Sequence, residues 1–397
     1  AWRILVCVVV LLAVYLALGR LVLAQLPTLR EPLFEKLNAS LPFHVEAESL
    51  VGSWEGFSPS LIFRRLTIAS SAPNTKAIAI AHGDLRIDVL ASLATRSLQL
   101  SHLGFSGLEL DGELREDGSL VLAGFQSSGG NGLQEWLEDF LPNVRELTLS
   151  EHQLNLLAPG NELFELNVDL ALLRTGNSRQ LKGVAENQQL RIAINAQGVG
   201  NPVMPNTWAG DIFLDVESSD LSKLNFLWEG LEWPFTLSGT ASTQLWLEQA
   251  AGNSDARLRV SSASLVVEER TNAWSLPLDA LSFEAALAKQ NRHWTLLTED
   301  FHIERGEHSL DLDRAQFDWW GNALRIRAKD LGLEALPSLL AAAPGVPKRL
   351  KDALPALRPR GKLQNIELRF DDLARPAESW HLRSRVSDIS MDSWRNS

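Results

Sequence analysis

The chain is poor in the residues that most often carry covalent and metal chemistry. Cysteine occurs once in 397 residues, as Cys7, so the chain can form neither an internal disulfide nor a cysteine-based metal site. Lys and Arg total 37 against 49 Asp and Glu, which gives a net charge of −12. A chain this acidic lacks the basic footprint of sequence-independent nucleic-acid binding. We therefore expect no nucleic-acid partner.

Short catalytic motifs are also missing. The sequence has no Gly-x-Ser-x-Gly, no Walker loop and no His-Glu-x-x-His, and Gly198-Val-Gly200 lacks the third glycine of a dinucleotide site. One cluster contains residue types that can bind metals, namely His302, Glu304, His308 and Asp311. These polar residues alternate with apolar ones along the chain, which favours solvated positions on a strand over a metal site. We expect a protein that is not an enzyme and that carries no cofactor and no metal.

A long apolar run opens the chain. Residues 4–18 are uninterrupted apolar residues, and the run resumes after Gly19-Arg20. A helix over residues 2–24 rises about 35 Å, enough to cross a bilayer. Arg20 can extend its guanidinium to the headgroups from near one end, and Arg3 at the other end favours a cytoplasmic N-terminus. The run predicts a transmembrane anchor over residues 2–26.

A cleaved signal peptide ending near Ala24 is the alternative, and a buried helix is a third. The apolar run is long for a signal peptide, and leucines at 26, 29, 33 and 37 continue the helical period. We therefore favour an uncleaved anchor in an inner membrane, followed by a short amphipathic helix over 27–41. The body, residues 42–397, would be periplasmic and would be the start of a longer domain whose C-terminal part is missing.

From Val45 onward the pattern changes to strict alternation of apolar and polar residues, typical of strands with one apolar face. Roughly twenty such strands, with short turns, predict a mainly β, mostly antiparallel sheet with few short amphipathic helices. The helices are expected at 133–141 and 220–231, with two more over 331–357 that are separated by Pro344-Gly345-Val346-Pro347. So large a sheet must turn its apolar face inward. The pattern alone leaves open a packed sandwich, a closed barrel or a long curled trough.

Residues 18–68 help to choose among the sandwich, the barrel and the trough. Leu18-Gly-Arg20, the segment 29–37, Pro42-Phe-His-Val-Glu46 and Ser53-Trp54-Glu-Gly-Phe57-Ser-Pro59 stand in that order. With the later stretch 88–103, this arrangement resembles the N-terminus of the YhdP-type AsmA-like proteins of Gram-negative bacteria. The resemblance is specific over about the first 110 residues. Beyond them it depends on architecture.

The resemblance implies the trough and a function. AsmA-like proteins, related in architecture to TamB, are bridge-like lipid-transfer proteins that carry phospholipids in an apolar β-groove from the inner to the outer membrane. Partners would then be phospholipids, the inner membrane and, through the missing C-terminus, the outer membrane or its proteins. The apolar residues expected to line the groove are Leu85, Ile87, Val89, Leu147, Leu149, Leu166, Val168, Leu170, Ile192, Ile194, Leu245, Leu247, Leu310, Leu312, Ile366, Leu368 and Phe370.

Two other interpretations compete with the conduit. An anchored periplasmic scaffold would help outer-membrane proteins assemble by binding client strands at open sheet edges. A dry, packed core would use the same leucines without any lipid. Five tryptophans fit either interpretation, because they could line a lipid groove or pack as ordinary core and edge residues. They are Trp228, Trp233, Trp246, Trp319 and Trp320.

Overall fold

The computed structural model describes most of the chain from residue 13 to residue 391. The described residues are 13–17, 19–21, 23, 25–40, 43–55, 58–70, 77–115, 120–122, 141–158, 163–200, 208–225, 235–250, 253–269, 275–290, 293–335, 337, 357–373 and 375–391. Much of the predicted anchor over residues 2–26, and the predicted helix over 133–141 up to residue 140, lie outside this set. In the described part, no helix combines the length and the apolar character that crossing a bilayer requires.

The predicted mainly β, antiparallel architecture is confirmed. All strands belong to one 19-stranded sheet. In the described part, β1 (Phe43–Glu55) pairs with β2 and β19 (Trp380–Ser390) pairs with β18, so the sheet is open. The chain forms two compact units. The first holds residues 1–187 and 195–208, and the second holds residues 188–194 and 209–397.

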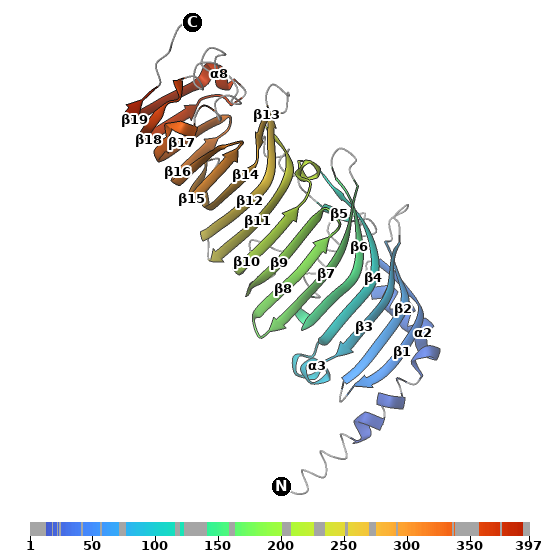
Figure 1. Ribbon diagram of the computed structural model, residues 1–397. Coiled ribbons are helices and arrows are strands. Elements are labelled where there is room, and N and C mark those ends of the chain that lie inside the picture. The colour runs from blue at the N-terminus through green and yellow to red at the C-terminus, as the bar shows by residue number, and fades with distance from the viewer. Residues whose placement is uncertain are drawn as a thin grey trace, which may run out of the picture. The chain divides into compact units, whose positions relative to one another are not determined.

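In the first unit, successive strands are joined mainly by short antiparallel connections. The strands after β1 are β2 (Ser58–Ser70), β3 (Ile78–Ile87), β4 (Leu100–Leu114), β5 (Leu120–Leu122), β6 (Glu146–Leu157), β7 (Leu163–Thr175) and β8 (Ser178–Glu186). One pairing differs: β4 and β6 run parallel, with Leu103 opposite Leu147 (Figure 1). The short strand β5 pairs with the far end of β4.

The second unit repeats the antiparallel pattern, and none of its described strands forms a parallel pair. Its strands are the first half of β9 (Leu190–Val199), β10 (Ala209–Ser218), β11 (Phe235–Ala250), β12 (Asn253–Glu269), β13 (Ser275–Leu278), β14 (Ala280–Gln290), β15 (His293–Arg305), β16 (His308–Trp320), β17 (Ala323–Gly332), β18 (Arg360–Phe370) and β19. Strand β12 pairs with both β13 and β14, and the other strands pair with their neighbours along the chain.

Helices are few and short in the described part. They are α2 (Leu26–Ser40), α3 (Val89–Thr95), α8 (Pro376–Ser379) and the 3₁₀ turns η1 (Leu141–Asn143), η3 (Leu221–Leu224) and η4 (Leu333–Ala335). Helix α2 contacts β1 (Figure 1). The Asn38 side chain accepts a hydrogen bond from the Val45 N–H and donates one to the Val45 carbonyl, at 2.7 and 3.1 Å. These bonds satisfy backbone groups that an edge strand otherwise exposes.

Two predicted helices differ from what is observed. Asp220 accepts a hydrogen bond from the Ser222 N–H, as an N-cap does, but the helix that it caps is the 3₁₀ turn η3. The predicted helical region over 331–357 begins too early, because β17 continues to Gly332 and η4 follows. Residues 336 and 338–356 of that region lie outside the described residues. The backbone of Leu331 and Gly332 pairs with β18, and this pairing outweighs the local helical pattern.

Bends recur at the same level of β2, β4 and β6 in the first unit. The apolar alternation shifts by one residue at Arg64-Arg65 in β2, Ser106-Gly107 in β4 and Ser150-Glu151 in β6. One residue of each pair has a positive φ, namely Arg65 at 49°, Gly107 at 65° and Glu151 at 57°. An irregularity of this kind bends a strand and increases its twist, while the same face stays apolar on both sides of the bend.

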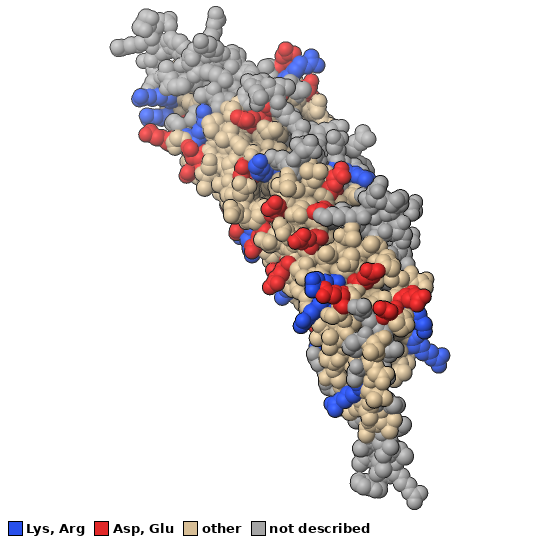
Figure 2. Space-filling view, turned by 90° about the vertical axis from the view of Figure 1, so that its right-hand side faces the viewer, with Lys and Arg blue, Asp and Glu red and all other residues tan. Residues whose placement is uncertain are grey.

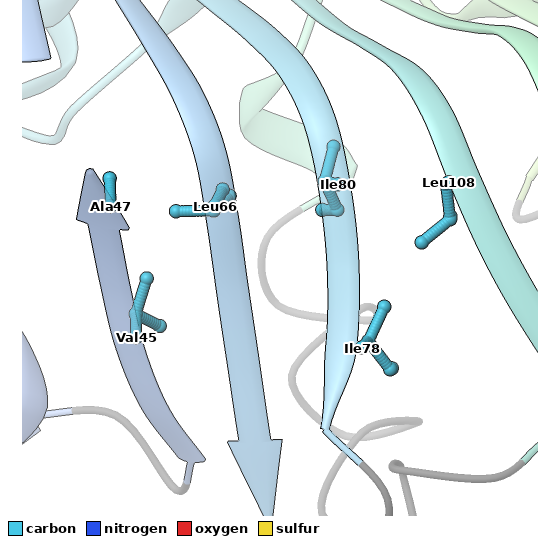
Figure 3. Packing of buried hydrophobic residues seen from close by; sticks show 6 residues of the cluster. All are labelled: Val45, Ala47, Leu66, Ile78, Ile80 and Leu108. Atoms are coloured by element: carbon cyan, nitrogen blue, oxygen red, sulfur yellow. The ribbon is translucent and has the colours of Figure 1, made fainter. Parts of the chain in front are cut away.

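A small apolar cluster lies on one side of these bends. Figure 3 shows its side chains projecting from β1, β2, β3 and β4 toward one another. Helix α2 adds the partly buried Phe34. The members are buried to 8% exposure or less: Val45, Ala47, Leu66, Ile78, Ile80 and Leu108. This cluster fixes the first strands of the unit.

Candidate functional site

The candidate site is the apolar face of the sheet, described separately in each unit. Residues directly opposite one another in paired strands point to the same face. In the first unit, Leu154 lies opposite Leu166 on β7, and Leu149 lies opposite Leu170. On the other side of β6, Leu149 lies opposite Phe105 of β4. Apolar side chains therefore continue from strand to strand on one face.

The predicted groove residues of the first unit lie on this face, with one exception. Leu85 and Ile87 pack against a cluster that contains Leu100, and Leu147 packs against the same cluster. Leu166 is 5% exposed. The predicted residues that are half-buried are Leu85, Ile87, Leu147, Leu149, Val168 and Leu170.

Val89 is the exception. It was expected to continue the alternation of Leu85 and Ile87, but β3 ends at Ile87 and Val89 is the first residue of α3. The cause is Asp88, whose carboxylate accepts a hydrogen bond from the Ala91 N–H at 2.9 Å and begins the helix. An N-cap at this position ends the strand, whatever the alternation indicates.

The second unit presents the same kind of face. Leu245 lies opposite Leu214 and Leu258, and Leu247 lies opposite Ile212. In β9, Ile192 and Ile194 alternate with Arg191, which forms an ion pair with Asp215. Farther along, each predicted residue faces an apolar partner across the strands: Leu310 faces Ile303, Leu312 faces Phe301, Ile366 faces Ala328, Leu368 faces Ile326 and Phe370 faces Leu324.

Most of these side chains are only half-buried, although strands flank them on both sides. Leu245, Leu247, Ile192 and Ile194 all fall in this class, and Leu312 and Ile366 are buried at 8%. Inward-facing residues of a two-layer sandwich are covered by a second sheet about 10 Å away. Half-burial on central strands means that the apolar face is incompletely covered.

Some residues of the apolar face lie beyond the bends, where strict alternation along the sequence does not predict them. Ala315, Phe317 and Trp319 share the face of Leu312, because the alternation shifts by one at Asp313-Arg314 in β16. Leu154 and Leu156 share the face of Leu149 in β6 for the same reason. Two adjacent polar residues between two alternating runs were the signal in the sequence that could have located them.

In the first unit, a buried polar side chain, His152 in β6, interrupts the apolar face. It lies opposite Val168 and is 3% exposed. Its Nδ1 accepts a hydrogen bond from the Leu108 N–H, and its Nε2 has no hydrogen-bond partner. Burial lowers the pKa of His152, partly opposed by the negative charge of Asp169. The ring is therefore neutral at pH 7.

The opposite face of the sheet carries the ion pairs. Arg259 and Glu284 pair across β12 and β14, and Arg314 and Glu299 pair across β15 and β16. On the surface shown in Figure 2, acidic and basic side chains are interspersed among uncharged ones. Charges on one face and aliphatic side chains on the other give each unit a strongly two-sided sheet.

Asp318 is the most buried charge on the polar face, at 2% exposure. Thr295, Gln316 and Arg327 donate hydrogen bonds to its carboxylate at 2.8, 3.0 and 2.9 Å. Burial alone raises the pKa of Asp318, but these hydrogen bonds outweigh it and lower the pKa to about 2. The carboxylate is ionised and fully engaged, which is typical of a structural rather than a reactive group.

The cluster around His302 is also paired internally. His302 Nδ1 lies 2.6 Å from Asp311 and its Nε2 lies 3.1 Å from Glu304. The hydrogen bond with Asp311 raises the pKa of His302. In the part of the chain that the structure describes, no group of three or more His, Cys, Asp or Glu is arranged to hold a metal ion.

The tryptophans divide between the two faces. Trp319 stacks on Trp294 on the apolar face, with centroids 5.8 Å apart and planes at 4°. Trp320 stacks on His293 with Arg325 over its ring, and Trp246 packs against Phe213 and Arg259 on the polar face. Trp228 and Trp233 lie outside the described residues. Of the described candidates, only Trp319 is placed to contribute to the apolar face.

Together, the fold and the face define a class: open antiparallel sheets that are apolar on one side over many consecutive strands. Comparison of the sequence with family models identifies the family within that class. The family model of the YhdP protein matches residues 1–397, so the chain belongs to the YhdP family. The resemblance seen at residues 18–103 is thereby confirmed. No curated protein and no solved structure matches the chain.

Proposed function

We propose that this chain belongs to a bridge that carries phospholipids along its apolar face between the inner and outer membranes and so supports the outer-membrane barrier. An uncleaved N-terminal helix would anchor it in the inner membrane, with the body in the periplasm. The observation that carries the proposal is the half-burial of aliphatic residues on central strands, together with membership of the YhdP family.

The chemistry suits acyl chains. Each buried methylene contributes about 0.8 kcal/mol, so a two-chain lipid is held by many weak contacts. Aliphatic walls bind every methylene alike and provide no preferred stopping point, so chains can slide. The polar headgroup would remain in water at the open side of the sheet. The bends would curl each sheet around its apolar face. The mechanism needs no nucleophile, cofactor or metal.

Photo-crosslinking tests the proposal directly. Leu170 and Ala171 are neighbours on β7 that point to opposite faces. A photo-reactive residue at Leu170 should crosslink phospholipid in membranes, and the same residue at Ala171 should not. Crosslinks from Leu170 to outer-membrane proteins instead of lipid would support the assembly-factor alternative and overturn the conduit.

A charged residue introduced on the apolar face tests whether that face is a packed core or is open to water and lipid. Val168→Asp places a carboxylate there, and Asn167→Asp places the same group one residue away on the polar face. On an open face the charge can reach water, so Val168→Asp should fold while lipid passage is blocked. Burying an unpaired charge in a packed core costs several kcal/mol. Misfolding of both Val168→Asp and Ile194→Arg, with Asn167→Asp unaffected, would contradict the conduit.

A further inference from the structure

One edge of the first unit combines exposed leucines with arginines. The end of β1 lies opposite the start of β2, the end of β3 opposite the start of β4, and the end of β7 opposite the start of β8. Because β6 runs parallel to β4, it starts at this edge too. Helix α3 connects β3 to β4 here (Figure 1). We call this the α3 edge.

Helix α3 presents an apolar surface to solvent. Leu90 is 80% exposed and Leu93 is 73% exposed, and their i, i+3 spacing places them on one side of the helix. Leu98, just after the helix, is 57% exposed. A short surface helix normally directs its polar residues outward. Three large leucines exposed together at one edge indicate a surface that is covered by an apolar phase.

Four arginines lie at the α3 edge, although the chain as a whole is acidic. Arg96 follows α3, Arg145 precedes β6, and Arg174 and Arg179 lie directly opposite one another in β7 and β8. None of the four forms an ion pair with a described residue. One guanidinium nitrogen of Arg179 is buried without a hydrogen-bond partner.

Two acidic side chains that the structure describes at the same edge have partners. Asp88 caps α3, and Glu146 lies 3.4 Å from His102. Two like charges directly opposite in a strand pair are destabilising unless an anion lies between them. Burial and the positive charge of Arg174 lower the pKa of Arg179.

The N-terminal helical segment reaches this edge. Residues 13–17 and 19–21 are helical, Tyr15 packs edge-on against Trp54 at 5.3 Å, and a Cβ added at Gly19 would overlap the same indole. Trp54 stands near the end of β1, at the level of the residues that lead into α3. A bilayer that holds the apolar N-terminal run would therefore meet the α3 edge.

We propose that the α3 edge docks on an anionic phospholipid bilayer, with Leu90, Leu93 and Leu98 inserted below the headgroups and the four arginines bound to lipid phosphates. This inference rests on the proposed anchor for the identity of the bilayer, and it is independent of lipid movement along the apolar face. Such a docked edge would hold the first strands of the sheet at the membrane surface, where lipid would enter.

The test measures insertion depth in the full chain reconstituted in phosphatidylethanolamine–phosphatidylglycerol vesicles. In a Cys7→Ser background, a bimane probe is attached at Leu93→Cys or at Leu163→Cys. Leu163 is a matched control, because it is also exposed, at 60%, and begins β7 at the opposite edge, about 40 Å away along the strand. Lipids brominated on their acyl chains quench only probes that enter the apolar phase.

We expect several-fold quenching at position 93 and none at position 163, with the quenching reduced by about 0.5 M salt and by omitting phosphatidylglycerol. Equal signals at the two positions, or free access of aqueous iodide to the probe at 93, would overturn the inference. Vesicle flotation separates this failure from failure of the anchor, because an anchored chain floats whether or not its edge inserts.

Discussion

The backbone N–H of Leu108 in β4 donates a hydrogen bond of 2.9 Å to Nδ1 of His152 in β6. Both residues directly follow a positive-φ residue, Gly107 and Glu151, where the ladder between the two strands is interrupted. The imidazole therefore replaces a backbone acceptor that the bend removes. On the other side of β6, the Asp169 carboxylate in β7 also replaces a backbone acceptor, because it accepts a hydrogen bond from the Glu151 N–H at 2.8 Å. Buried backbone donors need such partners.

The first prediction follows from the neutral state of His152. Burial lowers its folded-state pKa below the ordinary histidine value of 6.5, so the unfolded chain binds protons more readily. Its contribution to stability is present above about pH 6.5 and is lost as the pH falls toward the folded-state pKa. His152→Asn keeps an acceptor but does not titrate. Urea unfolding at pH 7.5 and 5.5 should show a smaller loss for the variant, and equal losses would contradict the assignment.

The second prediction concerns His302, whose pKa shifts the other way. Its hydrogen bond with Asp311 raises the folded-state pKa, so the added stability is fully present below pH 6.5 and is lost as the pH rises through the raised value. His302→Asn should therefore be more destabilising at pH 5.5 than at pH 8 in the same unfolding experiment. His44→Asn, at an exposed site in β1, serves as the control. A cost for His302→Asn that is independent of pH would refute this account.

The third prediction concerns Asp318. Asp318→Asn should cost about 1–3 kcal/mol of unfolding free energy, because Arg327 loses its charged acceptor and Thr295 loses part of its own. Since the pKa is lowered to about 2, the wild-type contribution is present at neutral pH and is lost as the pH falls from about 4 toward 2.

Glu299→Gln provides the control for this prediction. The Glu299–Arg314 pair joins the same two strands, but its side chains are 58% and 65% exposed. Exposed pairs contribute about 0–1 kcal/mol. Equal costs for the Asp318 and Glu299 variants, measured by urea unfolding at pH 7, would show that burial of Asp318 is not decisive.

The fourth prediction uses two glycines of equal backbone conformation. Gly107 in the bend of β4 has φ 65°, and Gly176 in the β7–β8 turn has φ 61°. A Cβ at Gly107 would lie 2.7 Å from the Cβ of Ala81, whereas one at Gly176 would meet nothing within 4 Å. Gly176→Ala should cost about 1 kcal/mol from backbone strain alone. Gly107→Ala should cost clearly more, and thermal unfolding of both variants measures the difference.

Alternation along single strands was enough to predict much of this protein. The runs around Leu166, Leu245 and Leu368 gave strands with one apolar face, because side chains alternate sides at every residue of an extended chain. The N-terminal motif around Trp54 pointed to the family that the whole chain matches. These features are local, so they can be recognised in the sequence without knowing what lies beside each strand.

What the tertiary structure decided is non-local. The parallel pairing of β4 with β6, and the bends at Gly107 and Glu151, depend on which strands become neighbours. So does the role of His152, which no alternation pattern assigns to the Leu108 N–H. The end of β3 before Val89 followed from a cap that competes with the ladder. Openness of the apolar face is the same kind of property, because burial depends on whether a second layer covers a residue, and that layer comes from distant parts of the chain.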